Sequence, residues 1–534
     1  MKVDITPCLC SFPVGKEISL SVDVSCEALM ELRVYKLDEL VFEDGFQLVA
    51  GTTCLHIPAM SACGGYGVEC TFHGADDEVE AHTAFVVGPS PVVRYGFSCD
   101  FSPGHDVSTE IDAFLKMHID TIQFYDWSYR HDDLVAPVPV YEDMMGKRNS
   151  LDVIRREIDM AHEKGMRALA YGAVYAACDD YWKMHPEQGL YDGAGRPVTF
   201  IDVFRIMNVA DDGWTNHMIG QYSKAMGEVG FDGIHLDAYG WPKSALDSAG
   251  APVRLEERLP SFINECRKGM KSRCGKDPFL IFNNVGAWPV TRTMDSSVDV
   301  VYCEIWPPMT RYRDLSTLIA LCRTSGKPVV MACYPKAFRL DEPDRALVCQ
   351  LLLSFVIAMH GATQLFFGDG GAVLTQGYYP DDSRLEPWQY DLVRCYQDFL
   401  VRYQDLMADD GLEDVSMTHQ DWDNPEYGLS CPSSADGEGG KVWCHVREDG
   451  RRKVVYLVNL IGNDDLWNEG KSEPPRIDID LDVLVLKKVC KAWCASPEEG
   501  LATLSGRLGV GDKGLVYSCR IRLHRVAMVY IEEE

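Results

Sequence analysis

The chain has 534 residues, which at roughly 150 residues a domain predicts about three or four domains. Hydrophobic residues make up 46% and charged residues 25%, which are the proportions of a folded globular protein rather than a disordered one. With 51 basic and 81 acidic residues, the formal net charge is −30. A field of this sign repels phosphate backbones and anionic lipid, so neither nucleic acid nor a membrane is expected as a partner.

The first 90 residues predict a small immunoglobulin-like β-sandwich. Residues 16–24 and 83–87 alternate partly between apolar and polar side chains, and residues 32–36 form a third candidate strand. No long helical period interrupts them. The Gly-Pro-Ser-Pro segment at 88–91 marks the end of this domain, because proline breaks a ladder and stiffens the link that follows.

Residues 91–410 alternate between short apolar runs and helix-like stretches. The runs predict eight strands, at 93–98, 121–125, 167–171, 233–236, 279–283, 300–303, 328–332 and 362–366. The stretches between them predict helices, at 108–118, 151–164, 214–229, 255–273, 311–325 and 341–359. The crossover at 290–297 is short, and a final amphipathic helix is expected at 387–407. Eight strands with crossovers over about 320 residues match a (β/α)8 TIM barrel, with a doubly wound open sheet as the alternative.

The remaining residues, 411–534, return to strands. Candidate strands lie at 454–460, 477–481, 515–523 and 526–531, and polar, Gly-rich segments separate them. They predict a C-terminal β-sandwich. The whole chain is therefore expected to be a multidomain α/β protein, in which two sandwiches flank the barrel and cover its sides without extending its cleft.

The twenty cysteines are too sparse for a disulfide scaffold. The close pairs Cys8/Cys10 and Cys490/Cys494 have the wrong spacing for a zinc motif, and no Cys-x-x-Cys occurs, so neither a structural zinc ion nor another cofactor is expected. No apolar segment follows the first seven residues as a secretory signal would require. The longest apolar run, 346–359, is too short to span a bilayer and predicts a buried helix. These features favour a cytoplasmic location.

Reactive groups of a barrel lie at the carboxyl ends of its strands. Here these positions hold carboxylates, amides and aromatic rings: Asp100, Asp126, Trp127, Tyr171, Tyr175, Asp237, Tyr239, Asn283, Asn284, Glu304, Trp306, Tyr334 and Asp369. A metal site would require histidines and a phosphate site would require basic residues, and the set contains few of either. Aromatic faces stack on sugar rings while carboxylates and amides bond their hydroxyl groups, so a carbohydrate substrate is predicted.

Two carboxylates end apolar strands, Asp237 after residues 233–236 and Glu304 after residues 300–303. Burying an unpaired carboxylate is costly unless it has a partner or a chemical task. Glycoside hydrolysis requires such a pair, one as nucleophile or base and one as proton donor. Each could instead cap a helix or pair with an arginine. His235 shares a strand face with Asp237 and is expected to pack in the core. Three further carboxylates could bind hydroxyl groups or cap loops: Asp100, Asp126 and Asp369.

Several segments resemble glycoside hydrolase family 66, which contains dextranases and cycloisomaltooligosaccharide glucanotransferases. They are Arg-Tyr-Gly-Phe at 94–97, Ile-Gln-Phe-Tyr-Asp-Trp at 122–127, Gly-Phe-Asp-Gly at 230–233 leading to Asp237, Tyr-Cys-Glu-Ile-Trp-Pro at 302–307, and Gly-Tyr-Tyr-Pro at 377–380. The resemblance covers the whole predicted barrel in order. It implies action on α-1,6-linked glucose chains with retention of configuration, with Asp237 as the nucleophile and Glu304 as the acid/base.

We therefore expect a retaining glycoside hydrolase that cleaves α-1,6-glucosidic linkages in dextran-derived or isomalto-oligosaccharides by double displacement. A cytoplasmic location favours short oligosaccharides over a polymer. The expected substrate-binding residues are Asp126, Trp127, Tyr171, Tyr239, Asn283, Trp306, Tyr334 and Asp369. One alternative is a transglycosylase that uses the same catalytic pair and passes the sugar to another sugar. The other is a catalytically silent carbohydrate-binding protein.

Overall fold

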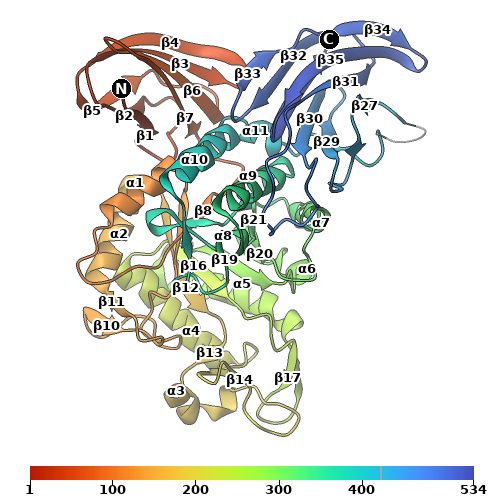
Figure 1. The fold of residues 1–534 in the computed structure, drawn as a ribbon. Helices are drawn as coiled ribbons and strands as arrows, with labels where there is room; N and C mark the ends of the chain where they lie inside the picture. Colours follow the sequence, from red (N-terminus) through yellow and green to blue (C-terminus); the bar gives the residue numbers. More distant parts are fainter. Residues whose placement is uncertain (421–423) are drawn as a thin grey trace.

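The computed structural model describes residues 1–420 and 424–534. Figure 1 shows a β-rich part at each end of the chain, red and blue, beside a central part in which strands and helices alternate. The two terminal parts contact each other, since Lys491 Nζ lies 3.0 Å from Asp38 Oδ1. Both lie at the end of the central part opposite the loops that carry α3 and β17 (Figure 1).

The N-terminal part consists of two antiparallel sheets with a shared apolar core. One sheet has the order β1 (Val3–Pro7), β2 (Ile18–Val24), β5 (Gly51–Ile57); the other has the order β4 (Glu39–Leu48), β3 (Ala28–Lys36), β6 (Gly64–His73), β7 (Glu78–Val87). Alternation within β2 buries Ile18, Leu20, Val22 and Val24. The expected strands 16–24, 32–36 and 83–87 correspond to β2, β3 and β7.

The central part contains one curled sheet whose main strands are parallel. In order these are β8 (Tyr95–Ser98), β9 (Thr121–Phe124), β12 (Arg167–Ala173), β16 (Gly233–Asp237), β19 (Phe279–Val285), β20 (Val300–Glu304), β21 (Val329–Ala332) and β22 (Thr363–Gln364). Each pairs with the next along the chain, and all eight coincide with the predicted runs. The segment after β22 continues as β23 (Phe367–Gly368), which pairs in parallel with β8. The last strand segment therefore contacts both β21 and the first strand.

Helices connect these strands. The long ones are α1 (Ser108–Lys116), α2 (Leu151–Glu163), α4 (Asp212–Lys224) with the π-turn η2 (Ala225–Val229), α5 (Leu255–Cys274), α7 (Tyr312–Arg323), α9 (Pro343–Met359) and α10 (Pro387–Arg402). The short ones are α3 (Asp179–Met184), α6 (Val290–Thr293), α8 (Ala337–Leu340), α11 (Gln404–Met407), η1 (Pro186–Gln188) and η3 (Asp369–Gly371). The expected single helix at 387–407 is divided, because the chain leaves helical geometry at Tyr403.

Small sheets extend from the carboxyl ends of the parallel strands. They comprise β10 (Val140–Glu142) with β11 (Arg148–Ser150), β13 (Ala176–Ala177) with β15 (Phe204–Ile206) and β14 (Thr199–Phe200), and β17 (Ser244–Leu246) with β18 (Pro252–Arg254). Two further short strands, β24 (Ala372–Val373) and β25 (Ser383–Arg384), follow β23. They build the walls around the strand ends.

The C-terminal part has two sheets and its own apolar core. One sheet has the order β26 (Glu413–Asp414), β29 (Val442–Glu448), β30 (Arg452–Asn459), β36 (Val526–Glu533), β32 (Val489–Ser496), β33 (Gly500–Thr503), with β28 (Ser433–Ser434) beside β29. The other has the order β27 (Tyr427–Leu429), β31 (Ile477–Val485), β35 (Gly514–Leu523), β34 (Arg507–Gly511). The first sheet also packs on the central part, because Trp443 and Tyr456 belong to the central apolar cluster.

Helix α9 contains the long apolar run of the sequence. Every residue from Ala346 to Met359 is buried, as predicted for a core helix. Among the residues that the structure describes, no helix is long and apolar enough to cross a membrane.

Candidate active site

The two strand-end carboxylates converge above the middle of the curled sheet. Asp237 is the last residue of β16 and Glu304 the last residue of β20, with β19 between these strands. The side chain of Asn283 on β19 bridges them. Its Nδ2 donates to Asp237 Oδ1 at 2.8 Å and to Glu304 Oε2 at 3.0 Å. The two acceptor oxygens therefore lie within about 6 Å of each other.

Two tyrosines hold the remaining carboxylate oxygens. Tyr171 on β12 donates its hydroxyl to Asp237 Oδ2 at 2.7 Å. Tyr334, beyond the end of β21, donates to Glu304 Oε1 at 2.7 Å. Each of the four carboxylate oxygens thus accepts one hydrogen bond, which fixes the orientation of both groups before a substrate arrives.

Burial makes both carboxyl groups weak acids. It raises the pKa of Asp237 to about 7, with a further contribution from the negative charge of Glu304. Burial also raises the pKa of Glu304, whereas the hydrogen bonds from Asn283 and Tyr334 oppose the rise. Two carboxylates this close in a dry site cannot easily both be charged, so the pair carries one proton near neutral pH.

A cavity of about 380 Å³ opens above the pair. All of its lining residues lie between positions 123 and 379, so neither terminal part contributes: Gln123, Tyr125, Tyr171, Phe200, His235, Asp237, Ala238, Tyr239, Asn283, Val285, Glu304, Trp306, Tyr334, Gly377 and Tyr379. A neighbouring cavity shares Tyr125, Tyr171, Phe200, Tyr239 and Gly377 and continues along Asp126 and Met145. The two form one continuous cleft.

Aromatic rings form the walls of this cleft. Tyr239 stacks on Phe200 with ring centroids 4.2 Å apart, and Trp306 lies 5.6 Å from Tyr334. The Trp306 side chain is 37% exposed, so one face of its indole is open to a ligand. On the floor, Tyr95 hydroxyl and His235 Nδ1 are 3.0 Å apart. Burial lowers the pKa of His235 to about 3, so this histidine is neutral.

Six of the eight expected substrate-binding residues line the cleft. Tyr171, Tyr239, Asn283, Trp306 and Tyr334 surround the carboxylate pair, and Asp126 lines the neighbouring cavity. Burial, together with the charge of Asp143, raises the pKa of Asp126 to about 7. His235 is buried as expected, although its ring also reaches the cavity floor.

Trp127 does not line the cleft, and its expected stacking on sugar is wrong. The residue is fully buried, its ring lies 4.7 Å from Phe231, and Nε1 donates to the Tyr171 carbonyl at 3.0 Å. The cause is local. Asp126 has a φ of +52°, so the backbone departs from strand geometry there and directs Trp127 into the layer between sheet and helices.

Asp369 also lies outside the cleft. The side chain is 4% exposed, and Oδ2 accepts the backbone N–H of Cys99 at 2.6 Å and of Asp100 at 2.9 Å. It therefore fixes the loop after β8 rather than binding a ligand. Asp100 has a similar local role, since its Oδ1 accepts the backbone N–H of Ser102 at 3.0 Å.

The sequence analysis missed several lining residues. Gln123 on β9 and Tyr125, the residue after its last, are two positions apart and both line the cleft, so strand parity could have identified them. Tyr379 stacks on Tyr125 at 4.1 Å but comes from an irregular segment with no periodic signal. Gly377 also lies close to the pair, since a Cβ there would lie 3.3 Å from Glu304 Oε1 and 3.4 Å from the Trp306 ring and would crowd both side chains.

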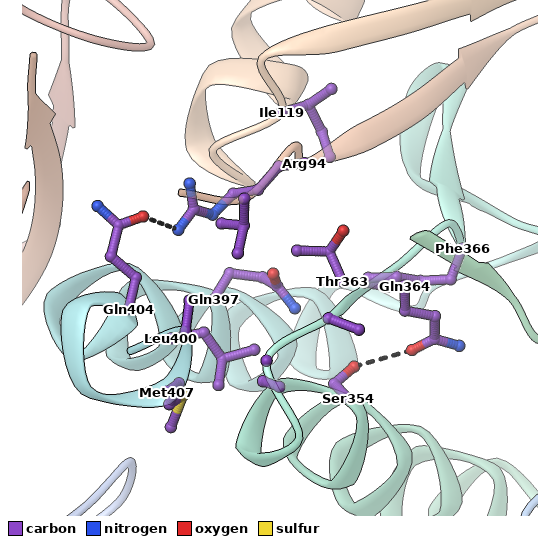
Figure 2. Close-up of a pocket in the computed structure, with 15 residues that line it drawn as sticks. Arg94, Ile119, Ser354, Thr363, Gln364, Phe366, Gln397, Leu400, Gln404 and Met407 are labelled. Carbon is purple, nitrogen blue, oxygen red and sulfur yellow. Dashed lines mark hydrogen bonds between the residues drawn. The ribbon is translucent and has the colours of Figure 1, made fainter. Parts of the chain in front are cut away.

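A second enclosed space lies at the opposite, amino end of the strands. Figure 2 shows it between α10, the end of α9 and the starts of β8 and β22, with Arg94 bonded to Gln404 and Ser354 bonded to Gln364. Its volume is only about 40 Å³, room for roughly one or two water molecules. No carboxylate among the described residues lines it, whereas Asp237 and Glu304 line the cleft at the carboxyl ends of the strands.

Comparison with known proteins gives one consistent family. The family model described as Glycosyl hydrolase family 66 matches residues 11–509. A cycloisomaltooligosaccharide glucanotransferase of Niallia circulans is 26% identical over 71% of this chain and 54% of its own length. A dextranase of Streptococcus salivarius is 21% identical over 67% of this chain and 50% of its own length. The chain thus spans about half the length of these curated relatives.

A solved structure shares the fold. The cycloisomaltooligosaccharide glucanotransferase of Paenibacillus sp., solved with cycloisomaltoheptaose, superposes with a TM-score of 0.89 over 99% of both chains. The sequence identity is 19%, so this similarity supports the architecture of the chain and not its substrate.

Proposed function

The chain belongs to glycosyl hydrolase family 66, and we propose that it is a retaining glycoside hydrolase acting on α-1,6-glucosidic linkages of dextran-derived or isomalto-oligosaccharides. One observation carries the proposal: Asn283 joins Asp237 to Glu304 through a single Nδ2 at the bottom of an aromatic cleft. Retaining glycosidases place their two carboxyl groups about 5–5.5 Å apart, whereas inverting enzymes need about 6.5–9.5 Å to admit water. A shared amide donor favours the shorter spacing.

We also infer that the curled sheet is a closed (β/α)8 barrel. Its eight parallel strands pair in chain order, and the segment from Thr363 to Gly368 contacts both β21 and β8. In such a barrel the active site occupies the carboxyl ends of the strands, where Asp237 and Glu304 lie. The predicted domain limits 1–90, 91–410 and 411–534 are retained as part of this proposal.

In the proposed mechanism Asp237 attacks the anomeric carbon while Glu304 donates its proton to the leaving oxygen. The single proton of the pair must then reside on Glu304. Tyr171 and Asn283 stabilise the carboxylate form of Asp237 by donating to both of its oxygens. After the leaving group departs, Glu304 is a carboxylate and takes a proton from water, which attacks the glycosyl ester and releases the sugar with its original configuration.

The substrate class rests on the cleft and on the relatives. Buried acceptor atoms, Gln123 Oε1 and Asn283 Oδ1, have no hydrogen-bond partner among the described residues, and sugar hydroxyl groups would supply the missing donors. Trp306 and Tyr239 offer rings for stacking. The relatives named above are a dextranase and glucanotransferases, which supports α-1,6-linked glucose. The thiol state of the twenty cysteines fits a reducing compartment, so the cytoplasm remains our proposed location.

Transglycosylation by the same pair is the second candidate, because two of the three curated relatives are glucanotransferases. The glycosyl ester would then be attacked by a sugar hydroxyl in place of water. A silent carbohydrate-binding protein is not favoured, since such a protein would have no need of two buried carboxylates with every oxygen oriented.

The test is incubation of the purified chain with isomaltotriose to isomaltohexaose and with dextran. We expect shorter sugars to appear, with the α-anomer as the first NMR-visible product. We expect no product from Asp237→Asn and strongly reduced product formation from Glu304→Gln. Asp180→Asn, at a carboxylate 97% exposed, is the matched control. Longer or cyclic products would identify a transglycosylase, and a β-anomer would contradict double displacement. Efficiency that rises steadily into the polymer would show a long open cleft and contradict the preference for short substrates.

A further inference from the structure

The outer face of the N-terminal sheet β1–β2–β5 brings two thiols and an imidazole together, far from the cleft. Cys54 and His56 lie two residues apart on β5, so both side chains face outward while Leu55 and Ile57 face the core. Cys8 follows β1 and remains in the sheet, because its N–H donates to the Ser19 carbonyl at 3.0 Å.

The ligand-type atoms of these side chains form a connected chain. Cys8 Sγ is 4.0 Å from Cys54 Sγ, and Cys54 Sγ is 3.7 Å from His56 Nε2. In a tetrahedral zinc site with bonds of about 2.3 Å to sulfur and 2.0 Å to nitrogen, neighbouring ligand atoms lie about 3.5–3.8 Å apart. Cys8 and His56 both contact Cys54. As the described side chains stand, the three ligand atoms are not all within 4.8 Å of one another, so Cys8 or His56 has to change rotamer before all three can meet one ion.

Sheet order explains why these thiols do not form a disulfide. Strand β2 lies between β1 and β5. In the pairing of β5 with β2, Cys54 lies opposite Ser21 and His56 lies opposite Ser19. Alternate strands are about 9.6 Å apart, beyond the limit of about 7 Å between the Cα atoms of a disulfide. The thiols therefore meet only through their side chains, on the face of β2 that carries Ser19 and Ser21.

Metal-binding histidines usually donate a hydrogen bond from the ring nitrogen that does not bind the metal, and Glu17 offers the acceptor for such a bond. Its Oε2 lies 3.1 Å from His56 Nδ1. A hydrogen bond from Nδ1–H to this carboxylate leaves Nε2, the atom facing Cys54, as a free lone pair.

From this geometry we propose that Cys8, Cys54 and His56 bind a divalent transition-metal ion of the zinc type, with water at the fourth position. Binding releases the two thiol protons to solvent and leaves a site that is neutral overall, because two thiolates balance the ion. The ion would join the outer strands β1 and β5 across β2 and so fasten the N-terminal strand to its sheet. The spacing of these residues along the chain does not indicate the site, because its ligands come from β5 and from the end of β1, and β2 lies between these strands in the sheet.

The test uses the full chain, reduced and stripped of metal, titrated with Co²⁺ and then with Zn²⁺. We expect one equivalent of Co²⁺ to produce near-ultraviolet thiolate charge-transfer absorption, and Zn²⁺ to abolish it. Cys54→Ser and Cys8→Ser should lose this absorption, and Glu17→Gln should weaken binding about tenfold. Cys26→Ser, at another exposed thiol of the same sandwich, should bind as the unaltered chain does. The altered side chains lie at the surface, so circular dichroism should confirm the fold of each variant.

Three outcomes would overturn the proposal. One is the absence of thiolate–Co²⁺ absorption in the unaltered chain. Another is Co²⁺ binding that is unchanged in both cysteine variants but is lost in His360→Gln, since His360, Asp414 and His445 form a separate, thiol-free group of potential ligands. The third is a Cys8–Cys54 disulfide found by peptide mapping of the untreated protein.

Discussion

Replacing Asp237 by asparagine should abolish catalysis and yet make the protein more stable at alkaline pH. Burial and the charge of Glu304 raise the pKa of Asp237 to about 7, from about 3.9 in an unfolded chain. The folded state therefore binds this proton more tightly than the unfolded state. The contribution of Asp237 to stability is complete below about pH 4 and is lost as the pH rises toward 7, at about 1.4 kcal/mol per pH unit.

The rise of roughly three units in the pKa of Asp237 lowers the free energy of unfolding by about 4 kcal/mol at pH 8. Glu304 titrates together with Asp237, so part of this cost belongs to the pair and not to Asp237 alone. We expect Asp237→Asn to recover about 2–4 kcal/mol at pH 8 and little at pH 5. For a chain of this size such a gain raises the melting temperature by about 2–4 °C. Asparagine has the shape of aspartate, and its oxygen can still accept the hydrogen bond from Tyr171. Its NH2 group then faces the Asn283 Nδ2 donor, so the hydrogen bond from Asn283 is lost and the gain in stability falls below the full value of about 4 kcal/mol.

The assay is thermal unfolding of both proteins at several pH values between 5.5 and 8.5, followed by circular dichroism. Asp180→Asn, on the exposed first turn of α3, is the control and should change stability by less than about 1 kcal/mol at every pH. A variant no more stable than the unaltered chain at pH 8 would refute the reasoning, as would a gain that is the same at pH 5.5 and pH 8.

The other predictions concern single side chains of the site. Glu304→Gln should lower kcat on unactivated glycosides by about 10²–10⁴ but much less on substrates with a phenolate leaving group; equal losses in steady-state assays would contradict its role as proton donor. Tyr334→Phe removes a donor to the Glu304 carboxylate, so the pKa of Glu304 should rise and the alkaline limb of the pH–rate profile should move to higher pH; a move to lower pH would contradict this. Trp127→Phe should lower the free energy of unfolding by about 1–3 kcal/mol and leave KM unchanged; a raised KM would show that Trp127 contacts the substrate after all.

The central fold was accessible from sequence because its strands are short, apolar and bounded by polar residues. All eight predicted runs coincide with parallel strands. The sandwiches were less accessible for two opposite reasons. Strand β4 is exposed along most of its length, so it lacks an apolar face, whereas β29 is buried on both faces between its own core and the central helices. Neither shows the alternation that identifies a half-buried strand.

Prediction of which side chains lie together agrees with the structure where one residue stands at or near the end of one strand. Asp237 and Glu304 end β16 and β20, Asn283 lies near the end of β19 between them, and the sheet brings the three together. It failed where two adjacent residues were both assigned to the cleft. Asp126 and Trp127 follow the same strand, and the left-handed backbone at Asp126 sends the second side chain into the core. A backbone reversal of this kind leaves no trace in hydrophobic periodicity.

The residue between the two carboxylates has to be an uncharged donor. A lysine there would attract both carboxylates and lower the pKa of each, leaving no proton for the leaving group. An aspartate would add a third negative charge and raise the pKa of the nucleophile as well. The Asn283 amide supplies one N–H to each carboxylate without either effect. Its Oδ1 is left buried without a partner among the described residues, a cost of about 1–3 kcal/mol that a sugar hydroxyl removes on binding. In the proposed mechanism the same side chain therefore both sets the protonation of the pair and favours binding of the sugar on which the pair acts.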